Sequence, residues 1–162
     1  MNRFKLSVMS VGCALLLGCG TSHTEPAGVL NSARIHFTGK NGQDEPGGNN
    51  CAVEIGEFTT VVKMKSTPCK NDEAYFYKFE NVPSATLITL DSEENCGVSS
   101  KTRDWRFTLR SYMTPTDTEW KRISDLRYKS EGDIIAPGVL YDSGKFRHGS
   151  IDGKLSCVVV RP

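Results

Sequence analysis

The chain has 162 residues, with 20 Lys and Arg against 19 Asp and Glu and a formal net charge of +1. This near-neutral balance provides no broad positive field, so a nucleic acid is excluded as the expected partner. The length suits one ordinary domain with a single hydrophobic core.

The N-terminal segment has the layout of a secretory signal peptide. A charged start, an apolar run over residues 8–17 and the small residue Gly18 precede Cys19. The apolar run is too short to span a bilayer as a helix. Its ending, Leu16-Leu17-Gly18-Cys19, resembles the lipobox of bacterial lipoproteins, which implies that Cys19 is acylated and becomes the first mature residue.

This resemblance also implies a location. Removing residues 1–18 takes two cations away and leaves a mature body of 144 residues with a net charge near −1. Several acyl chains hold a protein stably on a membrane. In that family, a residue other than Asp at position 20 implies the outer membrane, with the body facing the periplasm. Residues 19–31 are then the acylated cysteine and a flexible tether with a reach of roughly 20 Å, and residues 32–162 a single β domain.

The remaining cysteines predict two disulfides. Cys13 is lost with the signal peptide, so the body holds an even number of cysteines in an exported chain: Cys51, Cys69, Cys96 and Cys157. Three pairings are open. We favour Cys51–Cys69, because one short segment with a single strand separates these residues, and this leaves Cys96–Cys157. The C-x₂₋₄-C spacing of a zinc site is missing, so no metal is expected at these cysteines.

Beyond the tether, the pattern is mostly that of short β-strands. Alternating or β-branched runs predict strands at residues 33–37, 59–65, 74–80, 85–91, 105–110, 138–141 and 155–160. Turn-forming residues 81–84 predict that 74–80 and 85–91 form a hairpin. Residues 41–50 are interpreted as a long loop. A capping-box pattern at residues 116–119 favours one short helix near residues 117–127, with a single helical turn or an edge strand as alternatives.

Many short strands, two disulfides and frequent turn residues together predict the fold class. We expect an all-β, mainly antiparallel domain, built as a small disulfide-stapled β-sandwich or barrel.

The sequence offers little catalytic chemistry, so we expect no enzyme. Ser150 lies directly after Gly149, which is the wrong offset for a nucleophile elbow. The mature chain has three histidines, none of which shows the pattern of a catalytic base: His23, His36 and His148. Oxygen-rich stretches at Asp91, Glu93 and Asn95 and at residues 41–45 could hold Ca²⁺, but neither has the spacing of a known site. No cofactor is therefore predicted, apart from the lipid on Cys19.

A row of arginines is the best candidate for a binding surface. Arg106 and Arg110 share one face of the strand at residues 105–110, and Arg103 lies nearby. Such a row can pair with carboxylates or phosphates of a partner. The alternative is an exposed face that is kept soluble by its charge. The loop at residues 41–50 is the second candidate surface.

We interpret the chain as a membrane-anchored binding or inhibitory lipoprotein. Its expected partner is a secreted or periplasmic protein, such as a toxin that it neutralises. In layout only, the chain resembles the lipoprotein immunity proteins of type VI secretion phospholipase toxins. The alternative is an accessory or assembly lipoprotein of an envelope or secretion machine, and a ligand-binding barrel and an enzyme are the remaining classes.

Overall fold

The computed structural model describes residues 32–97 and 103–162. The expected signal peptide (residues 1–18), the lipidation site Cys19, the tether (residues 19–31) and His23 lie outside the described residues. Among the described residues, no helix is both long and apolar enough to cross a membrane.

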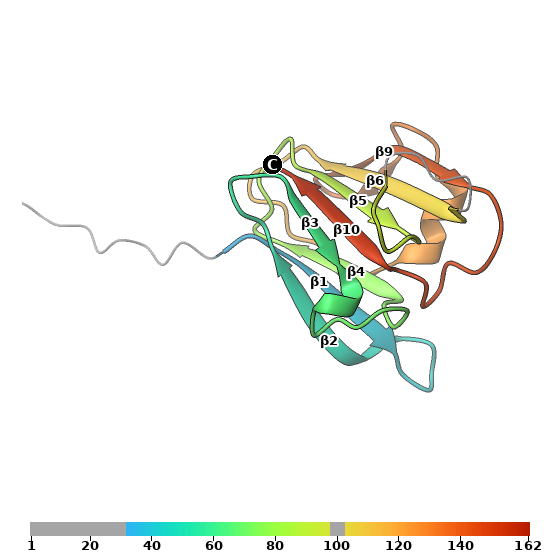
Figure 1. Cartoon of the computed structure of the whole chain (residues 1–162). Coiled ribbons are helices and arrows are strands. Elements are labelled where there is room, and N and C mark those ends of the chain that lie inside the picture. The colour runs from blue at the N-terminus through green and yellow to red at the C-terminus, as the bar shows by residue number, and fades with distance from the viewer. Residues whose placement is uncertain (1–31, 98–102) are drawn as a thin grey trace, which may run out of the picture. The chain divides into compact units, whose positions relative to one another are not determined.

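Two antiparallel sheets make up the fold (Figure 1). The first sheet has four strands, in the spatial order β2 (Pro46–Glu54), β1 (Arg34–Lys40), β4 (Phe76–Glu80) and β7 (Lys121–Arg122). The second sheet has six strands, in the order β3 (Thr60–Lys63), β10 (Cys157–Arg161), β5 (Leu87–Asp91), β6 (Trp105–Ser111), β9 (Val139–Phe146) and β8 (Ile134–Ala136). Two short 3-10 helices complete the described structure, η1 (Met64–Ser66) and η2 (Ile123–Tyr128).

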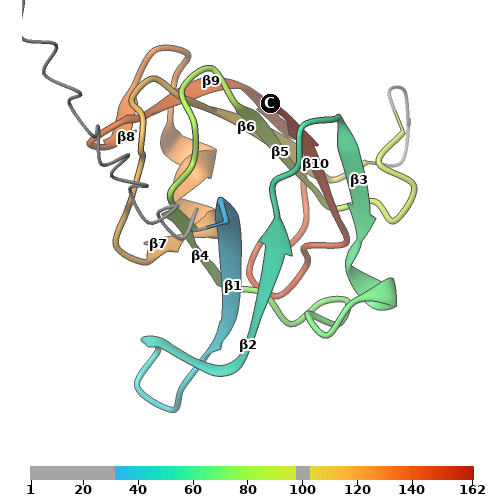
Figure 2. The same cartoon turned by 90° about the vertical axis from the view of Figure 1, so that its left-hand side faces the viewer.

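The core lies between the two sheets, which face each other in the turned view of Figure 2. Alternation along each strand sends one set of side chains inward. In β6 these are Trp105, Phe107 and Leu109, all at most 1% exposed. The rings of Trp105 and Phe107 stack with their centroids 5.2 Å apart. Such burial stabilises the domain by about 1.5–3 kcal/mol for each large apolar side chain. The fold is therefore a small all-β sandwich, which is one of the two architectures, sandwich or barrel, predicted from the sequence.

Both disulfides join the expected cysteines. Cys51–Cys69 links β2 to the segment after η1, with the Cα atoms 4.9 Å apart. Cys96–Cys157 links the loop after β5 to the start of β10, with the Cα atoms 5.6 Å apart. The favoured pairing is confirmed.

Two local predictions are wrong. Residues 74–80 and 85–91 do not form a hairpin, because β4 belongs to the four-stranded sheet and β5 to the six-stranded sheet. The turn between them instead carries the chain from one sheet to the other. Residues 41–50 are not one long loop, because β2 begins at Pro46 and pairs with β1 despite its glycines and asparagines.

The helix expected near residues 117–127 is present only in its last part. The 3-10 helix η2 begins at Ile123, after the short strand β7. The capping-box residues serve another purpose. The Thr118 hydroxyl accepts a hydrogen bond from the Phe79 N–H at 3.0 Å, and the Asp117 carboxylate accepts one from the Asn81 N–H at 2.8 Å. These side chains therefore tie the segment to β4 instead of starting a helix.

Candidate partner-binding surface

The predicted arginine row lies on the outer face of the six-stranded sheet. Arg106 and Arg110 alternate with the buried residues of β6 and point away from the core. The strand register places Asp91 of β5 on one side of Arg106 and Lys145 of β9 on the other. The prediction that Arg106 and Arg110 share a face is thus confirmed.

Arg103 and Arg106 hold a buried carboxylate between them. Asp91 has a fully buried side chain, and it accepts hydrogen bonds from Arg103 Nε at 3.0 Å and from Arg106 Nε at 2.9 Å. A second nitrogen of Arg106 lies 2.8 Å from the same carboxylate, and the Glu93 N–H donates to it at 3.0 Å. The side chains of Arg103 and Arg106 are only 12% and 24% exposed. We call this cluster of Arg103, Asp91 and Arg106 the arginine clamp.

The clamp changes two expectations from the sequence. Arg103 and Arg106 are not a freely solvated row, because their ion pairs with Asp91 hold them against the sheet. Asp91 is also unsuited to Ca²⁺, because both of its oxygens already face guanidinium groups, which would repel a cation.

The loop after β5 accepts hydrogen bonds from both arginines of the clamp. Arg106 donates a hydrogen bond to the Cys96 carbonyl at 3.0 Å, and Arg103 donates one to the Gly97 carbonyl. The Cys96–Cys157 disulfide fixes this loop to β10, where Cys157 pairs with Asp91 in the strand register. The two guanidinium groups are therefore oriented before any partner arrives.

Arg110 occupies a looser position on the same face. Its guanidinium lies 2.7 Å from the Asp142 carboxylate, and the two side chains are 44% and 26% exposed. This pair sits at the bulge of β9, where the register with β6 shifts between Thr108 and Leu109.

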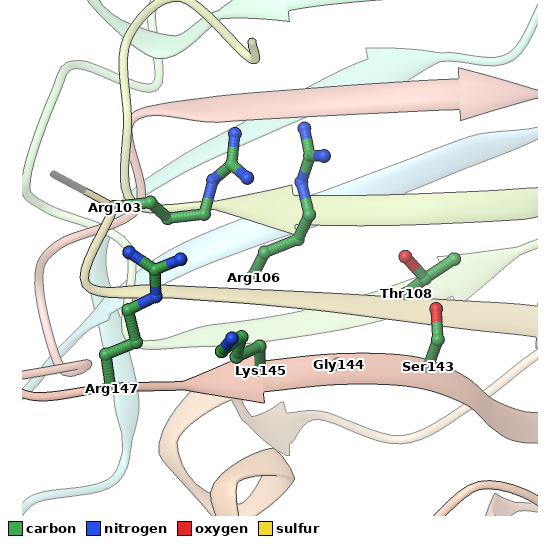
Figure 3. A pocket seen from close by; sticks show the side chains of 7 residues that line it. All are labelled: Arg103, Arg106, Thr108, Ser143, Gly144, Lys145 and Arg147. Atoms are coloured by element: carbon green, nitrogen blue, oxygen red, sulfur yellow. The ribbon is translucent and has the colours of Figure 1, made fainter. Parts of the chain in front are cut away.

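A recess opens beside the clamp, between β6 and β9 (Figure 3). It encloses about 250 Å³ and is lined by Arg103, Arg106, Thr108, Ser143, Gly144, Lys145 and Arg147. Figure 3 shows Arg103 and Arg147 at one end and the hydroxyl groups of Thr108 and Ser143 at the other. We call it the basic recess. Its lining contains four cationic side chains and two hydroxyl groups, although Arg103 and Arg106 direct their guanidinium groups to Asp91. Lys145 and Arg147, with the hydroxyl groups of Thr108 and Ser143, are the groups that suit an anion with several acceptor oxygens.

Gly144 lets β9 approach the core at this point. A Cβ atom built on Gly144 would lie 1.8 Å from the Tyr141 hydroxyl oxygen, so only glycine fits. Burial raises the pKa of Tyr141, which keeps this hydroxyl neutral below the recess.

Lys145 and Arg147 are not among the site residues predicted from the sequence. The predicted strand stopped at residue 141, whereas β9 continues to Phe146. The alternation of Lys145, Phe146 and Arg147 is the signal that could have extended the strand. Among the described residues, Lys145 forms no ion pair.

The other candidate residues lie elsewhere and serve local contacts. His36 Nε2 lies 2.6 Å from the Glu80 carboxylate, and His148 Nδ1 lies 3.1 Å from the Asp104 carboxylate. In the loop after β1, Asn41 accepts backbone hydrogen bonds from its own loop, and Asp44 pairs with Arg122 at 2.6 Å. This contact lowers the pKa of Asp44. Within residues 32–97 and 103–162, His, Cys, Asp and Glu form no group of three that could hold a metal ion.

No family model, curated protein or solved structure matches the chain.

Proposed function

We propose that the protein is a membrane-anchored binding lipoprotein of the immunity type, which neutralises a secreted or periplasmic protein by direct contact. The outer face of the six-stranded sheet binds an acidic surface of that partner. The observation that carries this proposal is the arginine clamp beside the basic recess, where cations that are already oriented surround a hollow.

Physical chemistry supports a binding role for this face. Arginine is enriched at the energetic centres of protein interfaces. A side chain fixed before binding loses little conformational entropy when the partner arrives, so more of the contact energy appears as affinity. Positive charges also speed association with an acidic partner and disfavour basic competitors.

The lipobox supports the anchored location. Changing Cys19→Ser should prevent acylation and release the protein from the membrane fraction. If the variant matures normally and remains in that fraction, the lipoprotein part of the proposal is wrong.

The binding role is tested by affinity capture with the tagged full chain from an envelope extract, followed by mass spectrometry. The substitution pair Lys145→Glu and Arg147→Glu reverses two exposed charges of the recess without touching the clamp. We expect one effector protein with the wild type, and at least a tenfold loss of affinity for the double variant, which is about 1.4 kcal/mol. The matched control is Lys129→Glu, an exposed lysine that directly follows η2 and is not among the residues that line the recess.

Two outcomes would argue against the proposal. A captured partner that binds the double variant as tightly as the wild type would place the binding surface elsewhere. Capture of a large envelope complex instead of one effector would favour an assembly lipoprotein.

A further inference from the structure

A second recess adjoins the basic recess on the same sheet face. It encloses about 260 Å³ and is lined by Val61, Thr89, Cys96, Arg106, Val159 and Arg161. We call it the apolar recess. Arg106 lines both hollows. Thr89 of one recess and Thr108 of the other are joined by a hydrogen bond of 3.1 Å between their hydroxyl groups, so the two recesses are neighbours.

The two recesses differ in chemistry. The basic recess presents Arg103, Lys145 and Arg147. The apolar recess presents two valines, Val61 of β3 and Val159 of β10, which are paired in the strand register, and it is also lined by Arg106 and Arg161. Val61 is 54% exposed on β3, the edge strand of the six-stranded sheet. Cationic side chains therefore line both recesses, and the valines are found only in the recess over β3 and β10.

Size favours side chains as the occupants. Pockets for small molecules typically enclose about 300–1,000 Å³. Each of these hollows is smaller, at about 250 and 260 Å³. One hollow alone suits a single inserted side chain, whereas the pair suits two side chains of one segment.

The strand order gives the distance between them. The basic recess lies over β6 and β9, and the valines of the apolar recess lie on β10 and β3. Because neighbouring strands are about 4.8 Å apart, the centres of the hollows are separated by roughly 10–15 Å. In an extended chain, residues four positions apart face the same side and lie about 13 Å apart.

We propose that the two recesses form one composite site for an extended segment of the partner protein. The segment places an acidic side chain in the basic recess and an aromatic or aliphatic side chain, four residues away, in the apolar recess. Arg106 contacts both. This inference rests on the proposed function, since it specifies what the sheet face recognises.

A peptide probe tests the composite site without a known partner. The probe is an acetylated and amidated peptide with Glu and Phe four residues apart in a Ser/Thr spacer. It is titrated into the full chain in detergent micelles, and amide chemical shifts are followed by NMR. We expect shifts at Ser143 and Lys145 and, at the same peptide concentrations, at Val61 and Val159.

Two altered probes and one variant separate the contributions. Replacing Glu by Gln, or Phe by Ser, should weaken binding at least threefold and reduce the shifts at the corresponding recess. The substitution Val159→Lys should fill the apolar recess and lower the affinity for the original probe to that of the Ser-containing probe. The control Thr59→Lys, at an exposed residue beside β3, should not change the affinity.

The results distinguish this inference from the proposed function. The composite site is overturned if the probe shifts only the NMR signals of the basic recess and binds equally well when Ser replaces Phe. That result leaves the basic face as the partner surface. A probe that shifts neither recess also overturns it. The proposed function fails separately, if a captured partner binds the Lys145→Glu, Arg147→Glu variant as tightly as it binds the wild type.

Discussion

Replacing the buried Asp91 by Asn should be among the most destabilising single changes on the outer face of the six-stranded sheet. The substitution keeps the size of the side chain but removes the charge that holds Arg103 and Arg106. Removing one partner of a buried ion pair typically costs 3–5 kcal/mol, because the other charge remains without compensation. The arginines are 12% and 24% exposed, so water can compensate part of this loss. We therefore expect the free energy of unfolding to fall by about 3 kcal/mol.

Asp142→Asn is the matched control. It removes the same charge from the same sheet face, and its partner is also an arginine, but Arg110 and Asp142 are 44% and 26% exposed. Ion pairs with this degree of exposure contribute about 0.2–1 kcal/mol. The two substitutions should therefore differ by about 2 kcal/mol.

Urea unfolding, followed by the fluorescence of the buried Trp105, measures both variants. With a slope of about 2 kcal/mol/M, Asp91→Asn should lower the urea midpoint by about 1.5 M. A double-mutant cycle with Arg106→Gln should then give a coupling energy above about 1 kcal/mol. If Asp91→Asn and Asp142→Asn lie within about 0.5 kcal/mol of each other, the clamp does not hold the arginines and the argument for oriented cations is refuted.

Three further predictions concern the rest of the domain. Alkylation of the unreduced, unfolded protein should label no body cysteine. Removing the Cys96–Cys157 disulfide by alanine substitution should lower the free energy of unfolding by about 4 kcal/mol, against about 3 kcal/mol for Cys51–Cys69, because the longer loop restricts the unfolded chain more. Equal urea midpoints for the two variants would contradict this order. Tyr77→Phe should raise the free energy of unfolding by about 1 kcal/mol, because the buried Tyr77 hydroxyl has no hydrogen-bond partner among the described residues; a marked loss of stability would reveal a partner. The hydrogen bond from His36 lowers the pKa of Glu80. The ionised carboxylate therefore stabilises the fold at any pH above 4.5, its ordinary pKa, and this effect is lost as the pH falls through the lowered pKa. Glu80→Gln should therefore destabilise the protein at pH 7 and have a smaller effect in acid, and a pH-independent difference in unfolding midpoint would be inconsistent with this linkage.

The fold class could be predicted because it depends on local patterns. The alternation of Trp105, Phe107 and Leu109 is visible in the sequence, and so are the even number of cysteines and the short strands. β2 could not be predicted in the same way. Its first five residues, PGGNN, have low strand propensity, and they join the sheet because Pro46 and Asn50 pair with Lys40 and Thr38 of β1 on either side of a register shift.

The candidate site could be predicted only in part, because it depends on strand register. The parity of β6 correctly places Arg106 and Arg110 on one face. Nothing in the sequence shows that Asp91 lies opposite Arg106, because this contact requires the pairing of β5 with β6. Lys145 joins the same row through the pairing of β9 with β6, which includes a bulge.

The proposed binding face and the second disulfide are connected by direct contacts. Cys157 pairs with Asp91 in the strand register, and the Cys96 carbonyl accepts a hydrogen bond from Arg106 at 3.0 Å. Reduction of the disulfide would free the loop that holds the two guanidinium groups, while the apolar core between the sheets would keep its contacts. The affinity of the proposed face should therefore fall on reduction, together with the stability of about 4 kcal/mol that this disulfide supplies. A binding surface of this construction suits an oxidising compartment, where disulfides persist, and this agrees with the export signal that we infer from the N-terminal sequence.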